Sequence, residues 1–137
     1  MDLSIVIPLF NEEESLPELL SWIERTLASW SGNFEVILID DGSTDGSWSV
    51  IETLIPQYPS ITAIRFSKNY GKSQALHAGF ARAKGQVVVT MDADGSHRVE
   101  DLPAMFAAIK TGKSIVLGTR WMPGGSVVNW PKSRQLL

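Results

Sequence analysis

The feature that most constrains the fold is an alternation of short, almost wholly apolar runs with longer segments of helical periodicity. The apolar runs are rich in Val and Ile and contain few polar positions. This pattern is typical of parallel strands that are covered by helices on both faces. The five predicted strands are residues 3–9, 34–39, 61–66, 86–91 and 114–118.

Helix signals occupy the segments between these strands. The four predicted helices are residues 11–30, 43–55, 71–85 and 99–112. In the first, Asn11 is a candidate N-cap, and the three glutamates after it stand where the helix dipole favours negative charge. Gly85 and Gly112 are predicted helix stops. Because strand and helix alternate, the sequence predicts an open, doubly wound, mostly parallel α/β sheet with right-handed crossovers and helices on both faces.

Length and composition fit one ordinary globular domain, residues 1–137, in which 44% of the residues are hydrophobic and 20% are charged. The net charge of −3 gives no reason to expect a nucleic-acid partner. The absence of cysteine excludes disulfides and thiolate metal sites. No apolar run approaches the ~20 residues of a membrane helix. Because the chain stops on the apolar pair Leu136 and Leu137, we expect it to be the front part of a longer domain.

A cluster of polar residues directly follows each predicted strand. Ligands of open α/β sheets bind outside the carboxyl ends of the strands, so these clusters are expected to meet at one edge. The clusters are FNEEE, DDGSTDG, SKNYGKS, DADGSH and TRWMPGG. The sequence therefore predicts one binding site built from five loops.

Asp92 and Asp94 are two residues apart after the fourth strand, so in an extended segment both side chains point to the same side. Two like charges this close repel each other, and a divalent cation relieves the repulsion. An all-oxygen site selects Mg²⁺ or Mn²⁺, usually shared with substrate phosphates. His97 could add a ligand or an acid–base group. The alternative is a solvated turn in which Asp94 caps the next helix, but the other four clusters favour a site.

Three other loops contribute candidate residues. Asp41 ends the second strand as one of two adjacent acids, which is more than capping a helix requires. An acid there could accept hydrogen bonds from the base or from the ribose hydroxyls. Lys68 and Lys72 could face an anionic ligand beside a helix N-terminus, although a plain helix start explains them equally well. Arg120, after the last strand, could grip a diphosphate bidentately.

Five motifs in chain order carry a family resemblance: SIVIPLFNEEESL, VILIDDGSTDG, KNYGKSQALHAGF, MDADGSH and GTRWMPGG. Together they resemble the motifs of family 2 glycosyltransferases, which have the GT-A fold. DADGSH and GTRWMPGGSVVNWPKSR are most similar to polyprenol-phosphate (dolichol-phosphate) mannosyltransferases. The resemblance spans the chain but only the front of such an enzyme. It implies that residues 1–137 are the nucleotide-sugar-binding part of an incomplete GT-A domain.

The resemblance implies contacts with the nucleotide for residues at the ends of the first two strands. Pro8, Phe10 and Glu12 would border the nucleotide, with Phe10 in place of the family's commoner Tyr. Ile39 and Asp41 would contact the base and the ribose.

It also implies roles around the donor diphosphate. Asp92, Ala93 and Asp94 would form the DxD motif, with Asp94 the main metal ligand and Asp92 assisting. Ser96 stands where many relatives carry a Gln metal ligand, so it is the candidate third ligand. Arg120 would reach the donor phosphates and, with Asp92 and Asp94, complete the catalytic set.

The implied activity is an inverting, Mg²⁺- or Mn²⁺-dependent transfer of mannose from GDP-mannose to a polyprenyl phosphate, at the cytoplasmic face of a membrane that the protein contacts peripherally. Two alternatives stay open. FSKNYGKSQALHAGF is also typical of polyprenol-phosphate glucosyltransferases, so the donor could be a UDP-sugar (glucose or an aminosugar) and the acceptor the same lipid or a polysaccharide. The chain could also be a non-catalytic nucleotide-binding module. An apolar face left by a missing C-terminal part could pair with a second copy.

Overall fold

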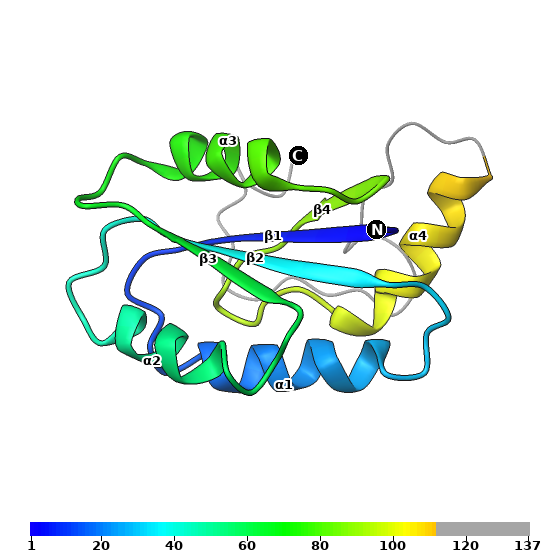
Figure 1. The fold of residues 1–137 in the computed structure, drawn as a ribbon, viewed down its shortest axis with the longest axis horizontal. Coiled ribbons are helices and arrows are strands. Elements are labelled where there is room, and N and C mark those ends of the chain that lie inside the picture. Colours follow the sequence, from blue (N-terminus) through cyan, green and yellow to red (C-terminus); the bar gives the residue numbers. More distant parts are fainter. Residues whose placement is uncertain (112–137) are drawn as a thin grey trace, which may run out of the picture.

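The computed structural model describes residues 1–111, which form one parallel sheet with helices on both sides (Figure 1). The sheet has four strands in the order β3-β2-β1-β4. They are β1 (Leu3–Leu9), β2 (Phe34–Asp40), β3 (Ile61–Arg65) and β4 (Val87–Thr90). Each strand agrees with its prediction to within one residue at either end. The predicted strand 114–118 lies outside the described residues.

The chain runs from β1 outwards through β2 to β3 and then returns past β1 to β4. The helices α1 and α2 cover one face of the sheet, and α3 covers the other (Figure 1). This arrangement confirms the predicted doubly wound sheet. The helices are α1 (Leu16–Leu27), α2 (Ser47–Leu54), α3 (Lys72–Arg82) and α4 (Leu102–Lys110), with a 3₁₀ turn η1 (Val99–Asp101) before α4.

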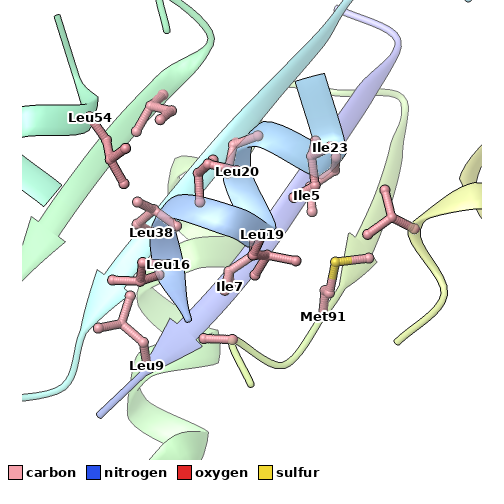
Figure 2. Close-up of a cluster of buried hydrophobic side chains, with 14 of the residues drawn as sticks. Ile5, Ile7, Leu9, Leu16, Leu19, Leu20, Ile23, Leu38, Leu54 and Met91 are labelled. Atoms are coloured by element: carbon pink, nitrogen blue, oxygen red, sulfur yellow. The ribbon is translucent and has the colours of Figure 1, made fainter. Parts of the chain in front are cut away.

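The core is thickest between α1 and the sheet. Figure 2 shows Leu16, Leu19, Leu20 and Ile23 of α1 facing the strand residues Ile5, Ile7 and Leu38. These side chains are almost fully buried, and complete burial of one such side chain stabilises by about 1.5–3 kcal/mol. The buried residues of α1 thus form a single apolar stripe, which is the pattern that its sequence predicts. Its members are Leu16, Leu19, Leu20, Ile23 and Leu27.

On the opposite face, α3 lies unusually close to the sheet. A Cβ atom at Gly79 would be 2.4 Å from Cγ1 of Val6 and 2.9 Å from Cδ1 of Ile39. Only glycine leaves room for this approach. The position of α3 over β1 and β2 is therefore closely defined.

The start of α1 differs from the prediction. The helix begins at Leu16, so Asn11 is not its N-cap and the three glutamates precede its first turn. Asn11 has a φ of 56°, a left-handed conformation that Asn tolerates better than most residues. Its side-chain oxygen accepts from the amides of Thr44 and Asp45, at 2.8 and 3.1 Å. The cap prediction was wrong because a neighbouring loop supplies the amide donors that a helix start would have supplied.

The end of α3 also comes earlier than predicted, at Arg82 rather than just before Gly85. The amide of Lys84 donates to the buried carboxylate of Glu35 (2.7 Å), and the amide of Gly85 donates to Oγ of Ser4 (2.8 Å). Ser4 in turn donates to Glu35 at 2.6 Å. These contacts across the amino edge of the sheet replace helical hydrogen bonds. The predicted stop at residue 112 lies outside the described residues.

Candidate functional site

A cavity of about 250 Å³ opens at the carboxyl ends of the strands. It lies where the chain order reverses on either side of β1, which is where open α/β sheets bind ligands. Each of the loops after β1, β2, β3 and β4 contributes to its wall. The lining residues are Pro8, Leu9, Phe10, Glu12, Asp41, Lys72, Asp92, Ala93 and Asp94. The prediction that the polar clusters meet at one edge is confirmed for these four loops.

Most of the predicted nucleotide-sugar-binding residues therefore lie together. Ile39 does not line this cavity, because its side chain is fully buried beneath α3. Ser96 is exposed and is likewise absent from the lining. Arg120 lies outside the described residues. Lys72 lines the cavity, although its sequence context was explained equally well by a plain helix start.

The wall formed by the β1 loop is attached to the β2 loop through side chains. The amide of Asn11 donates to Oγ of Ser43, and the amide of Glu12 donates to Oγ of Ser47, both at 2.9 Å. The amide of Gly46 donates to Glu13 at 3.1 Å in the reverse direction. These reciprocal bonds hold Glu12 in the cavity wall without help from a ligand.

Ser15 connects the β1 loop to the loop after β4. Its Oγ lies 2.8 Å from a carboxylate oxygen of Glu12 and 2.8 Å from the carbonyl oxygen of Ala93. A hydroxyl has one proton, so it donates to one of the two acceptors at a time. Ser15 was not predicted as a site residue, and its position between two cavity-lining residues depends on the folded arrangement of both loops.

Asp41 is buried and holds the loop that leads into α3. One carboxylate oxygen accepts from the amide of Tyr70 (2.8 Å), and the other accepts from the amide of Gly71 (3.0 Å) and the side chain of Asn69 (3.2 Å). Hydrogen bonds to a charged acceptor contribute about 1.5–3 kcal/mol each. The carboxylate predicted to contact base or ribose therefore also has a structural task.

Asp92 is paired with two side chains at the cavity. One of its carboxylate oxygens lies 2.8 Å from Nζ of Lys72, and the other lies 3.3 Å from Nε2 of His97. Partial burial acts to raise the pKa of Asp92, but the hydrogen bond and charge of Lys72, together with the smaller effect of His97, hold this pKa below its usual value. Asp92 is therefore ionised at neutral pH.

Asp94 lies at the start of a tight turn and does not cap a helix. Its Oδ1 accepts from the amide of Ser96 at 2.9 Å, and Gly95 between them has a φ of 78°. The next helical turn starts at Val99 and has no side-chain cap. The capping alternative is therefore wrong, and Asp94 lines the cavity.

Asp92 and Asp94 are the described carboxylates that could hold Mg²⁺ or Mn²⁺ at this cavity together with a donor phosphate. Within residues 1–111, no group of three or more His, Asp or Glu could hold a metal ion. Mg²⁺ commonly takes one or two carboxylates and completes its shell with water and substrate phosphates. Two carboxylates are enough for a metal of this shared kind, and Ser96 as a third ligand stays a prediction.

Residues 4–136 match the model of the family described as glycosyl transferase family 2. The chain belongs to this family. It is 42% identical over 137 residues to the dolichol-phosphate mannosyltransferase of Pyrococcus furiosus, covering all of this chain and 38% of the relative. It is also 42% identical over 114 residues to the undecaprenyl-phosphate 4-deoxy-4-formamido-L-arabinose transferase of Aeromonas hydrophila, covering 82% of this chain and 35% of the relative.

The fold agrees with this assignment. The mannosyltransferase PcManGT from Pyrobaculum calidifontis, solved in complex with GDP-Man and Mn²⁺, superposes with a TM-score of 0.67 at 27% identity. The match covers 79% of this chain and 31% of PcManGT. The predicted GT-A fold and the resemblance to family 2 glycosyltransferases are thereby confirmed. The chain spans little more than a third of the length of the curated relatives named above.

Proposed function

We propose that this chain is the donor-binding part of a metal-dependent, inverting glycosyltransferase that moves mannose from GDP-mannose to a polyprenyl phosphate. The observation that carries the proposal is the position of Asp92 and Asp94 together on the cavity at the reversal of the sheet. The 42% identity to a dolichol-phosphate mannosyltransferase along the whole chain supports the mannosyl donor and the lipid acceptor.

The chemistry requires little from the described side chains beyond binding and orientation. Cleavage between the anomeric carbon and the diphosphate leaves a nucleoside diphosphate, and a metal held by Asp94, with Asp92 assisting, would neutralise its charge. A lipid monophosphate has a second pKa of about 6 and is already a nucleophile at neutral pH, so the acceptor needs no general base. In-line attack on the opposite side of the anomeric carbon inverts its configuration.

Aromatic and acidic residues of the wall would orient the nucleotide. Phe10 exposes 43% of its surface at the cavity although it is large and apolar, and an aromatic ring there can stack on a flat base. Glu12 is held in place by the β2 loop and by Ser15. Under the proposal, Pro8 and Asp41 border the nucleotide, and Arg120 approaches the donor phosphates.

A UDP-sugar transferase is the second candidate. The 4-deoxy-4-formamido-L-arabinose transferase is as identical to this chain as the mannosyltransferase is, over a shorter match. This relative favours an aminosugar donor with a polyprenyl phosphate acceptor. The two candidates share the lipid acceptor and differ in the nucleotide and the sugar.

The proposal places the protein at the cytoplasmic face of a membrane, in peripheral contact with it. No acidic residue occurs between residues 53 and 91, whereas Lys68, Arg82 and Lys84 are exposed on or beside α3. Tyr70 and Phe80 are about half exposed on the same segment. Basic and aromatic side chains of this kind suit anionic lipid headgroups. Within residues 1–111, no helix has the length and apolar character needed to cross a bilayer.

Calorimetric titration with GDP and UDP, each with and without Mn²⁺, tests the proposal. We expect Mn²⁺-dependent binding with a preference for GDP, and loss of that dependence in an Asp94→Ala variant that keeps its circular dichroism spectrum. A preference for UDP would favour the second candidate. Nucleotide binding that is indifferent to both Mn²⁺ and Asp94→Ala would instead indicate a non-catalytic module. Transfer of label from GDP-mannose to polyprenyl phosphate is then measured in the full-length protein.

A further inference from the structure

We propose that Lys72 is a diphosphate-binding residue that exchanges partners during donor binding. In the ligand-free protein its ammonium group holds the carboxylate of Asp92, and it turns to the donor diphosphate when a metal takes that carboxylate. The inference rests on the proposed function and deepens it, because it assigns a residue to the donor phosphates. It also explains how Asp92 is stabilised before the metal arrives.

The contact that motivates the inference lies inside the cavity. Nζ of Lys72 is 2.8 Å from Oδ1 of Asp92, and both residues line the cavity wall. Among the lining residues in the described part of the chain, Lys72 is the sole basic side chain. A diphosphate bound beside Asp92 and Asp94 would therefore lie within the surroundings of this ammonium group.

The pair is suited to exchange because it is weak. The side chain of Lys72 is 63% exposed and that of Asp92 is 42% exposed. Ion pairs in contact with water gain little net free energy, since the charges are already well solvated. His97 contacts the second carboxylate oxygen at 3.3 Å, so Asp92 keeps one partner when Lys72 leaves. Neither the carboxylate of Asp92 nor the ammonium group of Lys72 is therefore left buried without an opposite charge or a hydrogen bond during the exchange.

The backbone of Lys72, in contrast, is firmly placed. Asp41 accepts hydrogen bonds from the three residues immediately before it, at 2.8–3.2 Å. The close approach at Gly79 fixes the helix that Lys72 begins. A fixed Cα with a flexible four-carbon side chain gives the ammonium a short, defined range of motion. Within this range it can reach either Asp92 or a ligand in the same cavity.

Electrostatics sets the direction of the exchange. A divalent cation at Asp92 neutralises the carboxylate and repels the nearby ammonium, so the Lys72–Asp92 attraction disappears. The diphosphate that accompanies the metal carries several negative charges and offers acceptor oxygens to the same ammonium. Metal and lysine therefore compete for Asp92 when no nucleotide is present, and they act together when it is bound.

The test uses Lys72→Met, which keeps an unbranched side chain as far as Cε and removes the ammonium group. Lys68→Met is the matched control, because Lys68 lies in the loop just before α3, over the ring of Tyr70 at 5.2 Å from its centroid, and does not line the cavity. Lys72→Arg restores a positive charge. Mn²⁺ binding without nucleotide is measured by electron paramagnetic resonance, and GDP and UDP binding at saturating Mn²⁺ by calorimetry.

We expect effects of opposite sign in Lys72→Met. Its affinity for Mn²⁺ alone should rise about two- to fivefold, because a competing cation worth a fraction of a kilocalorie is removed. Its affinity for the nucleoside diphosphate should fall about tenfold or more, because a charge-assisted contact is lost. Lys72→Arg should recover most of the nucleotide affinity, and Lys68→Met should match the wild type in both titrations. A merely structural effect would weaken both affinities together.

Two outcomes separate this inference from the proposed function. If the wild type binds a nucleotide with Mn²⁺ and Lys72→Met binds it equally well, the inference is overturned and the proposed function stands. If the wild type binds neither nucleotide with Mn²⁺, the proposed function fails and the inference fails with it. Equal Mn²⁺ affinity in wild type and Lys72→Met, including no binding to either, overturns the exchange.

Discussion

Gly42 is the position at which the structure predicts the sharpest effect of a single methyl group. Its φ is +71°, and a Cβ atom there would lie 2.2 Å from the carbonyl carbon of Lys68 and 2.4 Å from the amide nitrogen of Asn69. Both are backbone atoms, which cannot turn aside as the end of a side chain can. Gly95 also has a positive φ, of 78°, but a Cβ atom there would meet nothing within 4 Å. Gly95 is therefore the matched control.

The expected magnitude follows from two terms. A left-handed conformation costs an L-residue about 1–2 kcal/mol, while the stiffer unfolded chain offsets about 0.4–1 kcal/mol. Gly95→Ala should therefore lower the free energy of unfolding by about 0–1.6 kcal/mol. Gly42→Ala must also displace a backbone segment, and overpacking of this kind adds about 1–3 kcal/mol. We expect a total of about 1–4.6 kcal/mol for Gly42→Ala.

Urea unfolding followed by circular dichroism measures Gly42→Ala and Gly95→Ala side by side. The displaced segment carries the amides that bind Asp41, so Gly42→Ala should also weaken nucleotide binding at temperatures where it is still folded. If Gly42→Ala proved no less stable than Gly95→Ala, the close approach of the two loops would be refuted, and with it the account of how the loop before α3 is held.

Three further predictions concern charged side chains, two of them at the cavity and one at the far end of α3. Asp41→Asn should lower the free energy of unfolding by about 2–4 kcal/mol in urea, because an amide replaces an ionised acceptor of several N–H groups. Lys72 lowers the pKa of Asp92 in the folded protein, so the pair makes a small contribution to stability. This contribution is complete above the unfolded-state pKa of about 3.9, and it is lost as the pH falls through the lower folded-state pKa. Lys72→Met should therefore raise that pKa, measured by carbon NMR of the carboxyl group; an unchanged value would contradict the pairing. The double variant Arg82→Glu/Lys84→Glu should lose affinity for phosphatidylserine vesicles, at about 1 kcal/mol for each removed cation, in a sedimentation assay; equal binding would contradict contact through α3.

The strands and the α1 stripe could be predicted because their signals are local. Continuous apolar runs define buried parallel strands, and the spacing from Leu16 to Leu27 places one face of a helix on the core without knowledge of its neighbours. The position of the cavity also followed from sequence order, since the loops after parallel strands share one edge. These inferences require only the periodicity of the apolar residues and the order of the strands, and they do not depend on how individual side chains pack.

The sequence was least informative where a polar side chain had more than one possible partner. Asn11 has the sequence context of a helix cap, yet the amides it binds belong to residues more than thirty positions away. Asp41 was expected to face a ligand, and its oxygens also hold residues 69–71. Lys72 lies twenty residues from Asp92 in the sequence, so their contact depends on how closely α3 packs on the sheet. No local pattern distinguishes such partners.

The hydrogen bonds at the cavity fall into two classes that suit a donor site. The bonds that shape its walls join loops to one another, as Asp41 does for the loop before α3 and Ser15 does between the β1 and β4 loops. These bonds do not involve a ligand, so the walls can form before one binds.

The Lys72–Asp92 pair is different, because it is exposed. It joins a carboxylate that a metal would bind to an ammonium group that a diphosphate would bind. Binding would then require the exchange of one weak ion pair while the walls stay in place, which keeps the reorganisation free energy small. A titration in which Lys72→Met changes metal and nucleotide affinity in opposite directions would be the direct consequence of this division.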